Sequence, residues 1–323
     1  MMMNLLIAIA AGCASALMFA SISSGALIAL LLFYLAPLPL MLAAIGWGPI
    51  SAALGGVAAG LALGLIFSLP YLVAFLLAIA LPAWWLGYLV LLGRSVPAPA
   101  AANGATAPQT VEWYPVGRIL LWIAGFATLT TTGALLTLGT DSEAITTGLR
   151  HGLGRIMQVS PAGPDAALVI DALATVAPAA AAIITTMTLT LNLWLAAYVA
   201  SASGRLRRSW PVLRDVAMPP MTLVVLSVVL ALCFTAGMVA LVAQIAAAAL
   251  LLGYALTGFA VLHTVTRDMK SRGLLLSMAY ALVLVFGWPA IVMVVLGLAD
   301  AFFGIRQRYA QRGPPLPPPL PNP

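Results

Sequence analysis

The sequence predicts an all-α membrane protein: a polytopic transmembrane helical bundle with eight or nine spans. Hydrophobic residues make up 63% of the 323 residues and charged residues only 7%, whereas a soluble domain carries roughly a quarter charged residues. The stretch from Met1 to Gly93 contains no Asp, Glu, Lys, Arg or His, and it is long enough to cross a ~30 Å hydrocarbon layer several times. Lipid offers no hydrogen bonds to the backbone and the alternating pattern of barrel strands is absent, so the spans should be helices.

Nine apolar segments are separated by prolines, glycines or charged residues. The expected spans are Asn4 to Ser21, Ala26 to Ile45, Ile50 to Ser68, Tyr71 to Leu92, Val116 to Leu138, Ala174 to Ser201, Met221 to Met238, Leu241 to Val265 and Leu274 to Leu298. Pro37 and Pro39 lie in the second of these segments. Because proline has no backbone N–H, we expect this span to be broken near its middle.

Residues 1–304 are therefore expected to form one transmembrane helical domain with two longer polar loops. The loop at 94–115 is rich in Pro, Ala and Gly, and the loop at 139–172 carries several charged residues. An amphipathic helix is expected within the second loop, around Ala144 to Met157. Residues 305–323 are rich in proline, which favours extended or disordered chain over helix, so they are expected to be a disordered tail.

The distribution of basic residues predicts the orientation in the membrane, because cytoplasmic loops are enriched in Lys and Arg. Two short loops are basic, with Arg205, Arg207, Arg208 and Arg214 in one and Arg267, Lys270 and Arg272 in the other. This places both loops and the N-terminus in the cytoplasm, with a bacterial inner membrane as the expected location. Nine passes leave Arg306, Arg308 and Arg312 outside, against the rule, whereas a re-entrant break at Gly287-Trp288-Pro289 returns the C-terminus to the cytoplasm. Both alternatives fit the sequence.

Small residues recur at every fourth position in two of the expected spans. They are Ala8, Gly12, Ala16 and Ala20 in the first span and Ala52, Gly56, Gly60 and Gly64 in the third. Four-residue spacing puts each set on one helix face, where the small side chains allow close approach of another helix. The docking helix is expected to come either from this chain or from a separate membrane subunit.

Polar side chains inside the spans are candidates for a solute cavity. They are Thr185, Thr188 and Asn192 in the sixth span and Gln244 and Tyr254 in the eighth. The amide of Asn192 has donors and an acceptor that lipid cannot satisfy, so it should face the interior of the bundle. Two interpretations stay open: hydrogen bonding between helices, or the lining of a polar cavity that binds a small-molecule solute.

Three ionisable residues lie near the ends of spans, where hydration is expected. His263 is expected to lie at the membrane interface, and a proton relay is the alternative role. Asp300 lies at the end of the last span. Asp171 opens the sixth span, where its charge would complement a helix N-terminus. The segment Gly148 to Arg155 is expected either to form an interfacial amphipathic helix or to bind an anionic head group or phosphate.

The sequence carries no motif typical of catalysis or metal binding. His-Glu-x-x-His, Gly-x-Ser-x-Gly, P-loop and Cys-x-x-Cys patterns are all absent, so no enzyme activity, cofactor or metal is expected. The basic residues lie in short loops without interleaved stacking aromatics, which argues against a nucleic-acid partner. The expected partners are the lipid bilayer and, depending on the interpretation, another membrane subunit or a small solute.

Several of these features resemble the YybS-like family of multi-pass membrane proteins. The resemblance rests on the uncharged N-terminal third, the broken Leu38-Pro39-Leu40 segment, the glycine-rich third span and the ending Leu296 to Arg306, and it covers most of the chain except the loop after Gly139 and the tail. That family is distantly similar to the substrate-binding subunits of energy-coupling-factor transporters. The resemblance implies that the small-residue face of the first span docks a transmembrane coupling subunit. Those subunits usually have six spans, however, and no vitamin-binding motif is present here.

Two functional hypotheses follow from these patterns. The first is a small-solute-binding or transport subunit, and the alternative is a non-catalytic membrane scaffold in cell-envelope assembly. The polar residues of the sixth span favour the first, because a scaffold does not require them.

Overall fold

The computed structural model describes residues 2–97, 109–157, 164–212 and 216–311. The chain divides into two compact units. Unit 1 comprises Met1–Trp210 and Val224–Leu250, and unit 2 comprises Pro211–Leu223 and Leu251–Pro323. Within the described part of the chain, seven helical stretches are long and apolar enough to cross a membrane. The predicted α-helical membrane protein is thus confirmed, whereas the predicted count of eight or nine spans is not.

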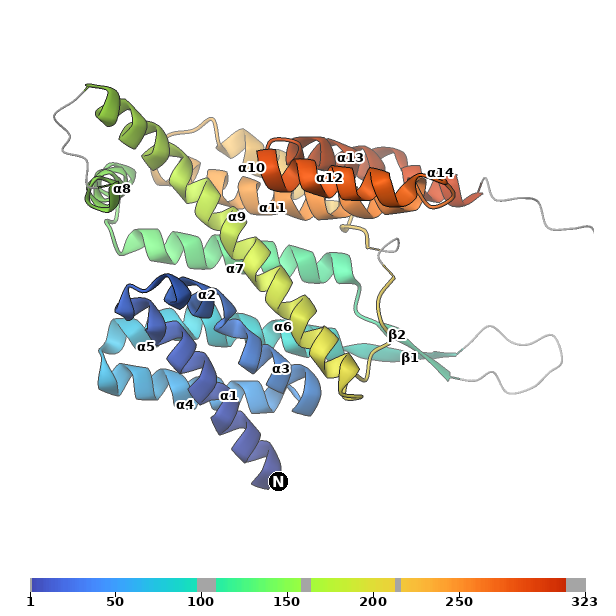
Figure 1. The fold of residues 1–323 in the computed structure, drawn as a ribbon, viewed down its shortest axis with the longest axis horizontal. Coiled ribbons are helices and arrows are strands. Elements are labelled where there is room, and N and C mark those ends of the chain that lie inside the picture. Colours follow the sequence, from blue (N-terminus) through green and yellow to red (C-terminus); the bar gives the residue numbers. More distant parts are fainter. Residues whose placement is uncertain (1, 98–108, 158–163, 213–215, 312–323) are drawn as a thin grey trace, which may run out of the picture. The chain divides into compact units, whose positions relative to one another are not determined.

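The elements of unit 1 follow the predicted spans closely up to the fifth span (Figure 1). They are α1 (Met2–Ala20), the 3-10 turn η1 (Ser21–Ser24), α2 (Leu27–Leu35), α3 (Pro37–Trp47), α4 (Pro49–Ile66), α5 (Leu69–Phe75), the π-helical segment η2 (Leu76–Ala80), α6 (Leu81–Leu91), α7 (Val116–Leu136), α8 (Ser142–Met157) and α9 (Pro164–Ala202). The amphipathic helix predicted around Ala144 to Met157 is α8. The sixth span begins at Pro164 rather than at Ala174, so the predicted loop 139–172 is shorter than expected.

The predicted loop 94–115 contains a short antiparallel hairpin that the sequence did not indicate. Strand β1 (Gly93–Pro97) pairs with β2 (Gln109–Trp113). The guanidinium of Arg94 lies 2.7 Å from the carboxylate of Glu112 in an exposed ion pair. Exposed pairs of this kind contribute little to stability, so the backbone ladder is the main support of the hairpin.

The second span is broken at the predicted proline. Helix α2 ends at Leu35 and α3 begins at Pro37, because proline cannot donate to the carbonyl one turn earlier. Two carbonyls at the break are bonded by side chains from other helices. The hydroxyl of Ser15 in α1 donates to the Ala36 carbonyl at 2.7 Å, and the Asn192 amide in α9 donates to the Tyr34 carbonyl at 2.8 Å. The break therefore ties three spans together.

The small-residue faces pack against helices of this chain. A Cβ on Gly12 would overlap the carbonyl oxygen of Gly55, and a Cβ on Gly55 would overlap that of Ala8, so α1 and α4 meet at backbone contact. Three further glycines of α4 pack against α5 and η2: Gly56 against Ala80, Gly60 against Leu76 and Gly64 against Leu72. Ala52 is buried and Ala16 and Ala20 are half-buried. These contacts lie within the chain, and they support the first of the two expected arrangements, in which the docking helix belongs to the same chain.

The C-terminal part differs from the predicted spans. Its helices are α10 (Met221–Leu232), α11 (Gly237–Val265), α12 (Arg272–Phe286), α13 (Ala290–Phe303) and α14 (Ile305–Gln311). The predicted seventh span is the 12-residue α10, and the predicted ninth span is split into α12 and α13, of 15 and 14 residues. All three are shorter than the ~20 residues of a typical bilayer crossing. Helix α14 replaces the start of the predicted disordered tail, and residues 312–323 lie outside the described residues.

Helices α12 and α13 form a hairpin within unit 2. The chain turns at residues 287–289, where Gly287 has φ 71°, a conformation that glycine adopts without strain. The Tyr309 hydroxyl after α13 donates to the Asp268 carboxylate before α12 at 3.3 Å. The ends of the hairpin therefore meet (Figure 1). Helices α11 and α13 also meet at backbone contact. A Cβ on Gly258 of α11 would overlap the carbonyl oxygen of Met293, and a Cβ on Gly297 of α13 would overlap that of Tyr254.

The contact between α1 and α4 predicts a strong effect of one glycine substitution. Gly12→Leu should lower the free energy of unfolding by about 1–3 kcal/mol, because the side chain must displace the backbone of α4. Thermal unfolding in detergent, followed by the loss of the monodisperse peak in size-exclusion chromatography, measures the change. Gly125→Leu in α7 is the matched control, because no atom lies within 4 Å of its Cβ position. Equal melting temperatures for the two variants would contradict the close approach.

Candidate functional site

A pocket of about 330 Å³ lies within unit 1 between α2, α3, η2, α7 and α9. Four threonines form its polar wall: Thr130 and Thr131 of α7, and Thr185 and Thr188 of α9. Most of the other lining residues are apolar, among them Phe33, Pro37, Ile79, Leu135, Ile184 and Leu189. No charged side chain lines this threonine pocket. It therefore suits an uncharged molecule, since an ion would lose its hydration there.

The threonine pocket lies where two helices are irregular. The break between α2 and α3 contributes Phe33, Tyr34 and Pro37, and the π-helical segment contributes Ala78 and Ile79. These residues are near the middle of the spans Leu27–Trp47 and Leu69–Leu91. Proline breaks and π-helical turns leave backbone groups without their regular partners and are frequent at functional sites. The pocket thus combines mid-span depth with locally irregular backbone.

The four threonine hydroxyls differ in how they are bonded. Thr130 donates to the Phe126 carbonyl at 2.8 Å and Thr185 to the Ala181 carbonyl at 2.9 Å. Both hydroxyls retain lone pairs that can accept a hydrogen bond. Thr131 is 4% exposed, and its hydroxyl has no hydrogen-bond partner among the described residues. The Thr131 hydroxyl therefore keeps both its donor and its acceptor capacity for a bound molecule.

The predicted cavity residues do not all come together. Thr185 and Thr188 line the threonine pocket, but Asn192 does not. Its amide nitrogen donates to the carbonyls of Tyr34 and Thr188, each at 2.8 Å. Of the two interpretations of Asn192, hydrogen bonding between helices is the one this geometry supports. Gln244 is exposed and Tyr254 is buried in unit 2, and neither lines the pocket.

The α7 half of the polar wall was missed in the sequence. Thr130 and Thr131 belong to a run of three threonines, Thr130 to Thr132, inside the fifth span. A threonine hydroxyl usually bonds to its own helix, so such a run is a weak signal by itself. Its importance depends on facing the threonines of α9, which the sequence does not show.

A second pocket of about 650 Å³ lies between α8 and α9. Arg150, His151 and Arg155 of α8 line it together with Asp171 of α9. The Nε of Arg150 donates to the Asp171 carboxylate at 2.6 Å. Asp171 was predicted to complement the N-terminus of its helix, but α9 begins at Pro164, about two turns earlier. Its partner is the arginine instead.

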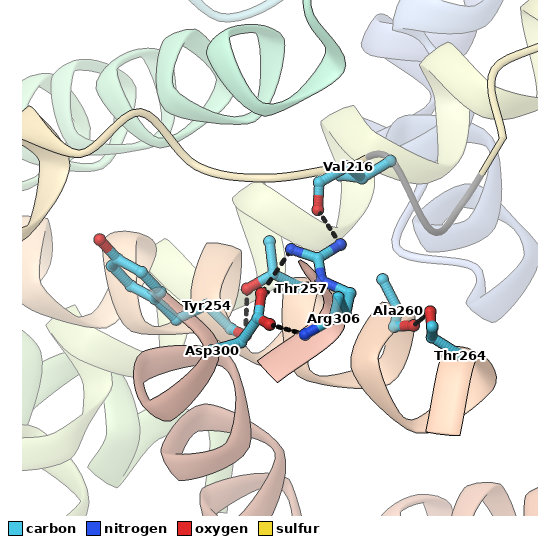
Figure 2. A network of polar contacts seen from close by, with 7 residues as sticks. All are labelled: Val216, Tyr254, Thr257, Ala260, Thr264, Asp300 and Arg306. Atoms are coloured by element: carbon cyan, nitrogen blue, oxygen red, sulfur yellow. Dashed lines mark hydrogen bonds and ion pairs between the residues drawn. The ribbon is translucent and has the colours of Figure 1, made fainter. Parts of the chain in front are cut away.

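A buried ion pair joins α13 and α14 in unit 2 (Figure 2). Asp300 and Arg306 are 8% and 9% exposed, and Nη2 of Arg306 lies 2.6 Å from Oδ2 of Asp300. The Arg306 backbone N–H donates to the same carboxylate at 2.9 Å, and Nη1 donates to the Val216 carbonyl at 2.8 Å. The expectation that Asp300 is hydrated at a span end was wrong, because the turn at Gly304 brings Arg306 back over it.

Other polar groups of unit 2 have local partners. The Thr257 hydroxyl donates to the Tyr254 carbonyl at 2.8 Å, while the Tyr254 ring points away from the ion pair (Figure 2). His263 Nε2 lies 2.8 Å from the Tyr280 hydroxyl. The ring of Tyr280 is stacked against Phe259. Within the described ranges, no cluster of three or more His, Cys, Asp or Glu side chains is placed to hold a metal ion.

Comparison with known proteins adds no relative to this picture. No protein-family model, curated protein or solved structure matches the chain. The functional argument therefore rests on the geometry of the chain itself.

The buried ion pair predicts a non-additive pattern of stability. Asp300→Leu or Arg306→Met alone should lower the free energy of unfolding by about 3–5 kcal/mol, because each leaves an unpaired buried charge. The double variant should recover much of this loss. Chemical unfolding in detergent of the two single variants and the double variant measures the coupling. Arg308→Met is the control, since Arg308 is exposed, and a loss as large as that of Arg306→Met would contradict the prediction.

Proposed function

We propose that this membrane protein binds a small uncharged solute in the threonine pocket and acts as a solute-binding or transport protein. The observation that carries the proposal is Thr131, a residue that lines the pocket and whose buried hydroxyl has no partner among the described residues. An unpaired buried hydroxyl costs free energy, and a ligand that bonds to it removes this cost.

The pocket also indicates the chemical class of the solute. Its volume of about 330 Å³ is near the lower end of the range of roughly 300–1,000 Å³ for ligand pockets. Its walls are mainly apolar, with threonine hydroxyls on α7 and α9. The solute is therefore a small, largely apolar molecule with a few hydrogen-bonding groups that face these two helices.

The irregular helices support a transport role in particular. Substrate sites of many transporters lie near the bilayer midplane and are built by discontinuous helices. Here the α2–α3 break and the π-helical segment η2 line the same pocket. Both are points where a span can bend, so the wall of the pocket can change shape without unfolding a whole helix.

The resemblance to the YybS-like family and, more distantly, to substrate-binding subunits of energy-coupling-factor transporters supports the same class. The proposal does not include docking of a coupling subunit on the small-residue face of α1, because α4 covers Ala8 and Gly12. The scaffold alternative loses its docking surface for the same reason, since Gly60 packs against Leu76.

Substitutions in the pocket wall test the proposal. Thr131→Val keeps the shape but removes the hydroxyl, and should weaken solute binding about fivefold, as expected for the loss of one neutral hydrogen bond of ~1 kcal/mol. Ala181→Leu fills the pocket and should abolish binding. Native mass spectrometry of the purified protein, followed by extraction of small molecules, measures the retained solute.

Thr128→Val is the matched control for these variants. Thr128 is half-buried on the same helix as Thr131, bonds to the Ala124 carbonyl at 2.8 Å and does not line the pocket. Retention should be unchanged in this variant. A wild-type protein that retains no small molecule, or equal retention in all variants, would refute the proposal.

We further propose that the protein spans a bacterial inner membrane with both termini in the cytoplasm. The hairpin of α12 and α13 brings Tyr309 to Asp268. This contact supports a position of the basic loop at 266–271 and of the basic helix α14 on the same side of the membrane. With α10 as a short crossing, every basic loop then lies inside, as the positive-inside rule requires.

Cysteine labelling tests this topology. In a Cys13→Ser, Cys233→Ser background, Met269→Cys and Gln307→Cys should react with a membrane-impermeant maleimide only after lysis of spheroplasts. Both positions are exposed. Gly152→Cys in α8 is the external control and should react in intact spheroplasts. Opposite labelling of positions 269 and 307 would exclude the hairpin topology.

A further inference from the structure

The pocket between α8 and α9 has a wall of basic side chains on one face of α8. Residues 147, 150, 151 and 154 follow the i, i+3, i+4, i+7 spacing that puts side chains on one side of a helix. Arg150, His151 and Arg155 all line the pocket, and Thr147 adds a hydroxyl. We propose that this site binds a phosphate group, carried by the head group of an anionic phospholipid. The inference is independent of the proposed function.

The charges of the site favour an anion. Asp171 is neutralised by its ion pair with Arg150, which uses Nε of the guanidinium. That pair fixes the orientation of Arg150 and leaves its Nη groups able to donate to a second acceptor. Arg155 is exposed and has no ion-pair partner in the part of the chain that the structure describes. Two planar guanidinium groups beside one pocket are well suited to phosphate oxygens.

The floor of the site leaves room for a ligand. At Gly154 the nearest atom to a Cβ position is Cδ1 of Ile170, at 4.0 Å. Ala167 is the other small residue of the lining. The pocket volume of about 650 Å³ therefore depends on a glycine and an alanine, and a larger side chain at position 154 would fill it.

The position of the site favours a lipid over free phosphate. It lies at the beginning of the apolar span Ala166–Ala202, where lipid head groups meet water. On the same turns of α9, Leu168, Leu173 and Val176 are 69%, 43% and 60% exposed, as expected for side chains that contact acyl chains. Arginines at a membrane surface attract anionic lipids. A phospholipid therefore satisfies both the basic wall and the neighbouring apolar surface.

Lipid competition measured by native mass spectrometry tests the proposal. The full-length protein is reconstituted in nanodiscs with equal amounts of phosphatidylglycerol and phosphatidylcholine, and the bound lipids are counted after release. Wild-type protein should be enriched in phosphatidylglycerol. Arg155→Gln should reduce the enrichment about fivefold, which corresponds to the ~1 kcal/mol expected per basic residue near an anionic lipid. Gly154→Leu, which keeps every charge, should reduce it at least as much.

Arg267→Gln is the matched control, because Arg267 is an exposed basic residue in another loop, and it should leave the enrichment unchanged.

A parallel titration with inorganic phosphate in phosphatidylcholine nanodiscs distinguishes the source of the phosphate group. Binding of phosphate that Arg155→Gln removes, without enrichment of phosphatidylglycerol, would keep the phosphate site but assign it to a free anion. Equal lipid binding by wild type and Gly154→Leu, with no phosphate binding, would overturn the proposal.

Discussion

The fold of unit 1 depends on a break at Pro37 inside a membrane span, where the regular backbone hydrogen bonding is interrupted and a carbonyl can be left without its donor. In hydrocarbon such a group has no water to bond to and costs several kcal/mol. Ser15 and Asn192 donate to the carbonyls of Ala36 and Tyr34 at the break. Each donor comes from a different helix, so these bonds connect α1 and α9 to the break between α2 and α3. The polar residues that looked most like a binding site are partly used to hold this break.

This use of Asn192 decides where a solute can bind. The threonine pocket lies beside the break, and Tyr34 and Pro37 belong to both. Because Asn192 donates to the Tyr34 carbonyl, the end of α2 is linked to α9 beside the pocket. The remaining polar wall consists of threonines, which satisfy much of their own hydrogen bonding within their helices. A weakly polar lining of this kind suits the proposed small, largely apolar solute.

The sequence was informative wherever a single segment determined the outcome. Apolar length located the first five spans, and Pro37 located the break, because each effect is local. The partner of a glycine face depends on contacts between distant segments, so the pairing of Gly12 with Gly55 was not predictable. For the same reason the hairpin of α12 and α13 stayed an open alternative. Its turn at Gly287 is visible in the sequence, but the meeting of its ends through Tyr309 is not.

Buried polar groups in this chain therefore differ in what they reveal about function. The amide nitrogen of Asn192 makes a hydrogen bond, and the guanidinium of Arg306 makes an ion pair, within the fold, and the burial of these two groups indicates structure. Thr131 is also buried, its hydroxyl has no partner among the described residues, and the residue lines a pocket. Since an unpaired hydroxyl in a membrane protein costs free energy, folding alone does not explain it. The proposed solute would supply the missing bond through its polar group.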